Sequence, residues 1–238
     1  MKLEKLTKEA GGRSGRRYHD ACGAAHGLDL VGERWALLVV RELMFGPRRF
    51  GDLKGDLCGI SANVLTQRLE GLEAAGIVRR RKLPPPASVQ VYELTGWGYE
   101  AQPVFEVLGR WAARSPQHDP SLPISAVSVM MSLRTMFDAD AWRASGGEEL
   151  DVGFVFGEQA FRARIADDEL SNVRVEGEAA LADCAVVFVG APVAVPQFVY
   201  GKRPLAEMEA EGSLAVTGDR AATDRFQTWF GLPEKAGA

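Results

Sequence analysis

The sequence predicts two domains of different fold class: a mostly helical N-terminal domain (residues 1–114) and an α+β C-terminal domain (residues 124–238). Residues 115–123 contain three prolines among Ser, Gln and Asp, which is the composition of a linker. The charge balance also reverses there, with 18 Lys and Arg against 13 Asp and Glu up to residue 114, and 10 against 19 beyond it. Apolar residues recur at helical spacing before the linker, whereas several strand-like segments follow it.

The overall composition is typical of a globular chain. Of the 238 residues, 46% are hydrophobic and 25% are charged. No apolar run approaches the roughly 20 residues of a membrane helix, and residues 1–20 are too charged for a signal peptide. We therefore expect a cytoplasmic protein without a membrane partner. The basic N-terminal half predicts a polyanionic partner for that half alone.

The segment Ser61–Gly76 predicts a short, well-capped helix. The Ser61 hydroxyl suits an N-cap, and Gly76 suits the left-handed residue that follows a helix. Leu65, Leu69 and Leu72 recur at helical spacing and are expected to face a core.

A second face of this helix carries Asn63, Thr66, Gln67 and Glu70. In the major groove of DNA, Asn and Gln pair bidentately with adenine and Thr contacts the thymine methyl group. We expect Asn63, Thr66 and Gln67 to read bases. The alternative is an ordinary surface helix, and the flanking segments decide between the two.

Two helices are predicted before this segment, over Glu33–Met44 and Phe50–Leu57. In the first, the expected inward side chains are Trp35, Leu38, Val39 and Leu43. A turn that contains a glycine, residues 58–60, joins the second of these helices to the helix of Ser61–Gly76. Two short helices joined in this way form a helix-turn-helix.

A wing is predicted directly after the second helix of this motif. Strands are expected at Ile77–Leu83 and Val89–Leu94, with a stiff loop of three prolines between them. The first strand carries four consecutive cations, which would hold phosphates; the alternative is a solvated run of charge. The candidate DNA-binding residues are Arg48, Arg49, Ser61, Asn63, Thr66, Gln67, Arg68, Arg79, Arg80, Arg81 and Lys82, although Arg68 could instead pair within the helix.

The last helix predicted before the linker spans Gly96–Ala113, with Thr95 as its cap and Pro103 as a possible kink. Its apolar seam is either the final core helix of the domain or a dimer surface. A dimer would place two recognition helices on half-sites about one DNA turn apart.

The N-terminal domain resembles the HxlR-type winged-helix transcription regulators over about residues 22–113. The matching residues are Cys22-Gly23, 28–35 (LDLVGERW), 37–43 (LLVVREL), 46–50 (GPRRF), Leu53, 59–61 (GIS), Leu65, Arg68-Leu69, Leu72, Gly76 and 92–95 (YELT). The resemblance implies a homodimer on double-stranded DNA, with terminal helices making the dimer contact. The three-proline loop departs from the family pattern and leaves the groove contact of the wing tip open.

The C-terminal domain is expected to be α+β, with helices on one face of an antiparallel sheet. Helices are expected at Ile124–Phe137, Asp138–Ala144, Ala194–Gly201, Pro204–Ala210 and Arg220–Gly231, and strands at Leu150–Phe156, Gln159–Ala166, Leu170–Glu176, Cys184–Val189 and Ser213–Thr217.

This order resembles the sterol-carrier-protein (type 2)-like lipid-binding fold over about residues 124–230. The matching segments are 182–184 (ADC), 200–202 (YGK), 212–214 (GSL) and 217–219 (TGD). The resemblance implies an apolar tunnel for a hydrophobic small molecule. Soft and aromatic side chains suit such a pocket, and the alternative for each is a place in the core. The candidate ligand-binding residues are Met130, Phe154, Phe156, Phe198, Met208, Phe226 and Trp229.

Motifs of catalysis are absent from the sequence. It contains no dinucleotide or phosphate-binding glycine motif, no HExxH and no GxSxG, and its three histidines lie in residues 19–118. The widely spaced cysteines Cys22, Cys58 and Cys184 predict free thiols rather than a disulfide framework or a zinc site. We expect neither an enzyme nor a bound metal or cofactor.

Cys22 matches the position of a cysteine that some HxlR-type members use to sense oxidants and electrophiles. His19, His26 and the Arg16-Arg17 pair could lower its pKa, and a plain structural thiol is the alternative. The sequence thus predicts a DNA-binding regulator, with repression the expected direction, that responds to a hydrophobic effector. The alternatives are a thiol-based sensor at Cys22 and a lipid carrier without a DNA function.

Overall fold

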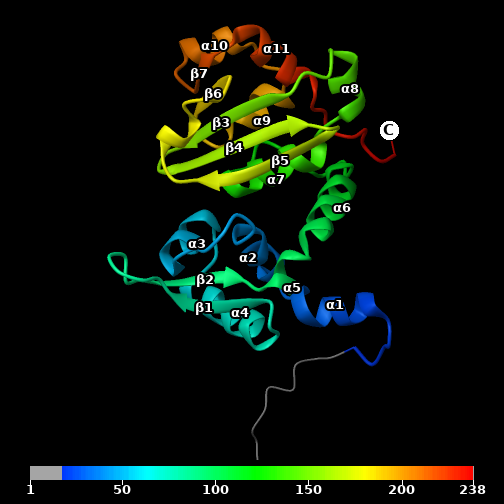
Figure 1. Cartoon of the computed structure of the whole chain (residues 1–238). Coiled ribbons are helices and arrows are strands. Elements are labelled where there is room, and N and C mark those ends of the chain that lie inside the picture. Colours follow the sequence, from blue (N-terminus) through cyan, green and yellow to red (C-terminus); the bar gives the residue numbers. More distant parts are fainter. Residues whose placement is uncertain (1–17, 238) are drawn as a thin grey trace, which may run out of the picture.

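The computed structural model describes residues 18–237. Figure 1 shows a small N-terminal helical region below a larger α+β region, with the C-terminal segment returning toward the boundary between them. The N-terminal elements are α1 (Gly23–Val31), α2 (Ala36–Glu42), α3 (Phe50–Asp56), α4 (Ala62–Ala74), β1 (Val78–Lys82), β2 (Gln90–Leu94), α5 (Gly96–Tyr99) and α6 (Gln102–Ala113).

Two predicted helices differ from those of the structure. The helix expected from Glu33 begins only at Ala36, because the backbone of Trp35 is left-handed with φ 79°. On this helix Leu38 is 37% exposed, so its expected burial is wrong. The helix expected over residues 96–113 is divided into α5 and α6, because Pro103 has no N–H to donate and is tolerated only in the first turn of a helix.

The C-terminal region contains the predicted helices and strands with ends shifted by at most three residues, and in addition a short 3-10 turn. Its elements are α7 (Ala126–Met136), α8 (Ala139–Ala144), β3 (Leu150–Phe156), β4 (Gln159–Ala166), β5 (Glu169–Val175), η1 (Glu178–Leu181), β6 (Val186–Gly190), α9 (Ala194–Val199), α10 (Leu205–Ala210), β7 (Leu214–Gly218) and α11 (Arg220–Thr228).

The five-stranded sheet has the order β5-β4-β3-β6-β7 and is mixed, so the expected purely antiparallel sheet is wrong at one pair. Strand β6 runs parallel to β3, whereas the other neighbours are antiparallel. After β5 the chain crosses through η1 back to the end at which β3 starts, where Ala185 N–H donates to the Asp151 carbonyl at 2.9 Å. A strand that enters from that end must share the direction of β3.

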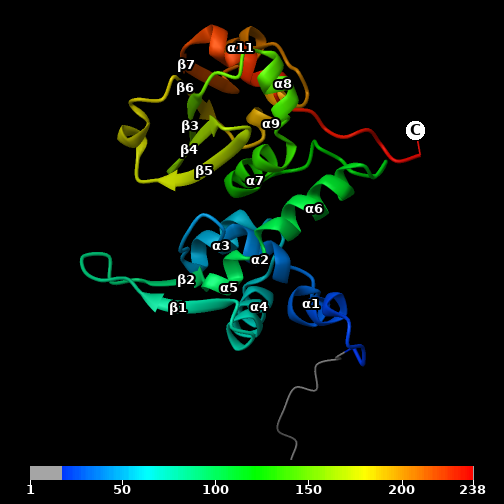
Figure 2. The same cartoon turned by 45° about the vertical axis from the view of Figure 1, so that its right-hand side comes forward.

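Helix α7 joins the two regions. It packs against β5 of its own sheet and also against α2 and α6 of the N-terminal region, and Figure 2 shows it between the sheet and these helices. The C-terminal segment adds a second connection, because Ala236 N–H donates to the Arg114 carbonyl at 2.7 Å at the end of α6. The domain boundaries at 114 and 124 remain a prediction.

Candidate DNA-binding surface and domain junction

Helix α4 begins and ends as its sequence predicts. The Ser61 hydroxyl accepts a hydrogen bond from Val64 N–H at 3.3 Å, which satisfies one donor of the first turn. Leu65, Leu69 and Leu72 are at most 2% exposed and lie in the N-terminal core. Burial of these three leucines fixes which face of α4 points outward.

The outward face of α4 carries Asn63, Thr66 and Gln67, all of them exposed. Gly59, with φ 86°, forms the turn between α3 and α4, and the buried Ile60 anchors that turn to the core. Figures 1 and 2 show α4 and the β1–β2 hairpin on the side of the N-terminal region away from the C-terminal region. The second region therefore leaves this face open to a duplex.

The wing is the antiparallel pair β1–β2, and its arginines are held by two carboxylates. Arg79 and Arg81 both donate to the carboxylate of Glu93, at 2.7 and 2.9 Å. On the other side of β1, Arg80 pairs with Glu73 of α4 at 2.6 Å. Burial raises the pKa of Glu93, but hydrogen bonds from Arg81 and Arg79 outweigh it, so the pKa is lowered. A charged Glu93 therefore fixes both guanidinium groups.

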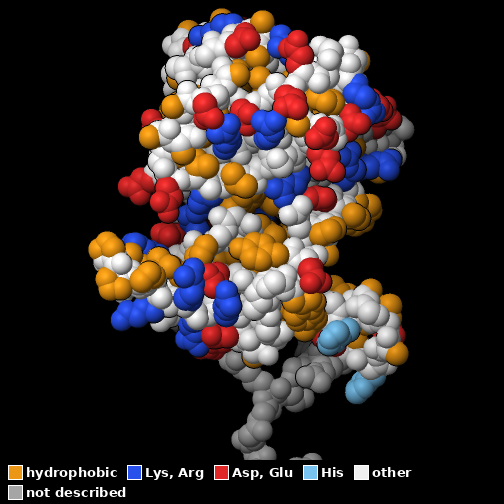
Figure 3. Space-filling model, viewed as in Figure 1, with side chains coloured by type: hydrophobic (Ala, Val, Ile, Leu, Met, Phe, Trp, Pro, Cys, Tyr) orange, Lys and Arg blue, Asp and Glu red, His pale blue; other side chains and the backbone are white. Residues whose placement is uncertain are grey.

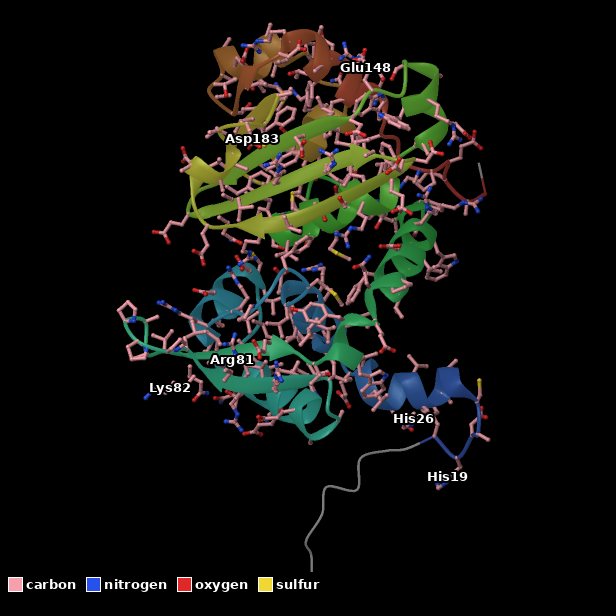
Figure 4. The ribbon with its side chains drawn as sticks, viewed as in Figure 1. His19, His26, Arg81, Lys82, Glu148 and Asp183 are labelled. Atoms are coloured by element: carbon pink, nitrogen blue, oxygen red, sulfur yellow. The ribbon has the colours of Figure 1, made fainter. Side chains whose placement is uncertain are left out.

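These ion pairs leave the arginines accessible to a phosphate. The side chains of Arg79, Arg80 and Arg81 are 65%, 49% and 45% exposed. Figure 3 shows Lys and Arg side chains gathered over the wing and the adjoining face of the N-terminal region. In Figure 4, Arg81 and Lys82 lie on the wing, on the far side of the N-terminal region from His19 and His26.

Arg48 and Arg68 depart from their predicted place on this surface. Arg48 is only 8% exposed, forms an ion pair with Asp56, and exchanges two backbone hydrogen bonds with Tyr92. In this structure it ties α3 to the wing, and its predicted phosphate contact stays a prediction. Arg68 forms an ion pair at 3.2 Å with Glu33, which lies before α2 and not in the helix of Arg68, so this partner differs from the predicted one. Arg49 is exposed beside them.

Helix α6 has an apolar face that the described residues leave uncovered. Val107 and Trp111 are each 72% exposed, and Val104 and Leu108 are 49% and 42% exposed. Together with Pro103 they line one shallow, almost wholly apolar depression. Contiguous exposed apolar side chains of this kind mark interaction surfaces.

The seven predicted ligand-binding residues are brought together, but as a packed core. All are at most 5% exposed, and their rings contact one another. The Phe226 ring centroid lies 5.5 Å from that of Phe188 and 6.2 Å from that of Phe154. None of the seven lines the depression on α6 or either of the two cavities between the N-terminal and C-terminal regions.

Cys22 precedes α1 and is exposed. The backbone N–H groups of Ala24 and Ala25 at the start of the helix favour its thiolate and lower the pKa of the thiol. The Arg16-Arg17 pair invoked for the same effect lies outside the described residues.

Among the residues described, no group of three His, Cys, Asp or Glu side chains could hold a metal ion. The helices in this part of the chain are also too short or too polar to cross a membrane.

The junction between the two regions contains a buried acid that the sequence analysis missed. Glu42 of α2 is fully buried, and its Oε1 accepts hydrogen bonds from Arg41 (2.7 and 3.0 Å) and from the Ser125 hydroxyl (2.8 Å). Its Oε2 has no partner. Burial raises the pKa of Glu42, against the opposing effect of Arg41. One signal in the sequence could have predicted this burial. Glu42 lies three residues after Val39, at the helical spacing of the apolar residues of α2, so a charged side chain occupies a position on the buried face.

Two partly buried side chains, Phe45 and Arg174, also pack across the same junction on the buried Phe161. The edge of the Phe45 ring packs on Phe161 of β4, with centroids 5.6 Å apart. The Arg174 guanidinium lies over the Phe161 ring at 5.1 Å, and burial lowers its pKa to about 10. These contacts pack the segment that follows α2 against β4 and β5 of the sheet.

Two cavities adjoin at this junction. The first, of about 410 Å³, lies between the α3 end of the N-terminal region and the start of α7; the second, of about 310 Å³, lies between α2, α6 and α7. Leu38, Arg41 and Ser128 line both.

Comparison with known proteins identifies the N-terminal region. The model of the family described as HxlR-like helix-turn-helix matches residues 30–119. The HTH-type transcriptional regulator YodB of Bacillus subtilis is 39% identical over 83 residues, which cover 35% of this chain and 74% of YodB. The chain belongs to the HxlR-like helix-turn-helix family.

Further HxlR relatives are matched over the same part of the chain. An HTH-type transcriptional regulator of Synechocystis is 43% identical over 83 residues, 35% of this chain and 62% of that relative. The solved structure of reduced YodB from B. subtilis is 34% identical and covers 41% of this chain and 98% of its own, with a TM-score of 0.38. The HxlR match ends at residue 119, before α7.

Proposed function

We propose that this protein is a dimeric DNA-binding transcription regulator whose C-terminal domain makes it responsive to a hydrophobic small molecule. The observation that supports this best is the exposed face of α4 beside the cationic wing, on the side that the second domain leaves open. Asn63, Thr66 and Gln67 are proposed to read base edges. Arg49, Arg79, Arg80, Arg81 and Lys82 are proposed to hold phosphates.

Gln67→Ala tests base reading. The variant is expected to lose about 1–3 kcal/mol of discrimination at one base pair while it keeps its affinity for unrelated sequences, because an amide reads a base edge and not the backbone. Binding to a set of single-base variants of a selected duplex measures this. Gln117→Ala, at an exposed glutamine of the linker, is the matched control. Unchanged discrimination for Gln67→Ala would exclude this side chain from readout.

Arg80→Ala tests the wing. It is expected to weaken binding to all sequences alike and to reduce the slope of log affinity against log salt by about one, because one phosphate contact is lost. Arg143→Ala is the control, since Arg143 is similarly exposed (50%) and ion-paired but lies in the C-terminal domain. An unchanged slope for Arg80→Ala would remove the wing from the proposed interface.

The C-terminal domain is proposed to be sterol-carrier-like and to bind the effector. Its order of elements supports this: two helices, three antiparallel strands, a crossover to a fourth strand, two helices, a last strand and a closing helix. Met130, Phe154, Phe156, Phe198, Met208, Phe226 and Trp229 stay candidates for the interior of such a domain. Because they pack on one another, a ligand among them would have to displace those contacts.

A second candidate function is thiol sensing at Cys22, which its exposure and lowered pKa favour. Cys22→Ser is then expected to abolish any loss of DNA binding caused by an oxidant and to leave a response to apolar ligands intact. The exposed Cys58, changed to Ser, is the matched control. DNA binding of both variants before and after diamide treatment measures the difference. An equal response of Cys22→Ser and the parent chain would exclude the thiol sensor.

A further inference from the structure

The two adjoining junction cavities have the chemistry of a binding site for an amphipathic molecule. Apolar side chains from α6 and α7 line the second cavity, among them Phe105, Leu108, Met131 and Met136. Hydroxyl groups of Ser125 and Ser128 line the first, 2.7 Å apart. A cavity of a few hundred Å³ with a largely apolar wall and a few convergent polar groups is the usual form of a small-molecule site.

Arg41 is the cation at this site. It lines both cavities and its side chain is 23% exposed. The planar guanidinium group has five N–H donors, and two of them donate to Glu42 Oε1. The other N–H groups of this fork do not point at Glu42 Oε1. A guanidinium beside an apolar wall suits a carboxylate, because the fork can donate two parallel hydrogen bonds to it. Asp56, also at the first cavity, is already paired with Arg48.

We propose that this junction cavity is the effector site and that it takes an amphipathic carboxylate, with the apolar part between α6 and α7 and the carboxylate on Arg41. The inference rests on the proposed regulator function and gives it a ligand class, but it moves the effector from the interior of the C-terminal domain to the boundary between the two domains. It differs from the interior pocket that the sterol-carrier resemblance implies, since its walls come from both domains.

The position of the cavity explains how a ligand would alter DNA binding. Leu108 lines both the cavity and the exposed apolar face of α6, where the proposed dimer contact lies. Leu37 and Leu38 belong to α2, which packs against α4. A ligand with different affinities for two arrangements of these helices shifts the population between them, and with it the spacing of two recognition helices.

The test uses the full chain with decanoate as the carboxylate probe and decanol as its uncharged match, measured by calorimetry. Gly109 lines the second cavity, and a Cβ there would meet only Thr135 Cγ2 at 3.9 Å. A longer side chain at this position therefore has to enter the cavity, and Gly109→Leu is expected to weaken both probes at least about tenfold. Gly96→Leu, at an exposed glycine of α5 that lines neither cavity, is the matched control and is expected to change neither.

Arg41→Lys tests the head group separately. It keeps the charge beside Glu42 but removes the fork, so decanoate is expected to bind about tenfold more weakly while decanol is unchanged. A folded Gly109→Leu variant that binds decanoate like the parent chain would overturn the location. Equal weakening of both probes by Arg41→Lys would overturn the ligand class. If Gly109→Leu does not fold, the Arg41→Lys comparison still decides.

DNA binding of the same preparations separates this inference from the function on which it rests. Salt-sensitive DNA binding by the parent chain, without any affinity for decanoate, would overturn the effector site and leave the regulator intact. Decanoate binding without any DNA binding would contradict the regulator and favour a carrier.

Discussion

Val107→Asp is expected to convert the proposed dimer into a monomer and to weaken specific DNA binding by about a hundredfold or more. Val107 is 72% exposed at the centre of the apolar face of α6 and is therefore free to contact a second copy of the chain. A carboxylate buried there without a partner disfavours association, and a monomer engages one half-site instead of two. Sedimentation measures the mass, and titration of a selected duplex measures the affinity.

Val107→Leu, which keeps the apolar character, is the control and is expected to remain a dimer. A Val107→Asp variant that sediments as a dimer with undiminished DNA affinity would place the dimer contact elsewhere.

Phe226→Ala is expected to lower the free energy of unfolding by about 3–5 kcal/mol. The Phe226 ring is fully buried and contacts four other rings, the nearest being that of Phe230 with centroids 4.7 Å apart. Its removal leaves a cavity that a close-packed core cannot fill. Urea unfolding monitored by circular dichroism measures the change.

Val189→Ala is the control for this substitution, because Val189 lies on β6 next to Phe188, whose ring Phe226 contacts, but is itself 40% exposed, and a small change is expected. The experiment also weighs the two interpretations of the apolar residues of this domain. A loss below about 1 kcal/mol for Phe226→Ala would show that Phe226 lines an open pocket, because the truncation would remove few packing contacts.

The parts of the fold that the sequence predicted well depend on local signals. Ser61 and Gly76 mark the ends of α4 through capping chemistry that involves only neighbouring residues. The two wing strands follow from alternation on either side of three prolines. Such signals act within a few residues, so they survive without knowledge of the tertiary fold.

The parts that the sequence could not predict depend on distant contacts. The direction of β6 is set by a crossover, and alternation of side chains is the same in a parallel and an antiparallel strand. Arg48 and Arg49 are adjacent arginines after Pro47, and the sequence does not distinguish them. Only the contacts of Arg48 with Asp56 and Tyr92 give it a structural role. Burial of Phe226 was predictable, but periodicity cannot distinguish a core residue from the wall of a pocket.

The most direct test of the central proposal is selection of duplex DNA from a random library by the full chain. A dimer that reads DNA with two copies of α4 is expected to recover a two-fold symmetric sequence with half-sites about 10 base pairs apart, centre to centre. Its affinity is expected to fall steeply with salt. Recovery of no common sequence, with no salt-sensitive binding, would contradict the proposal that this protein is a DNA-binding regulator.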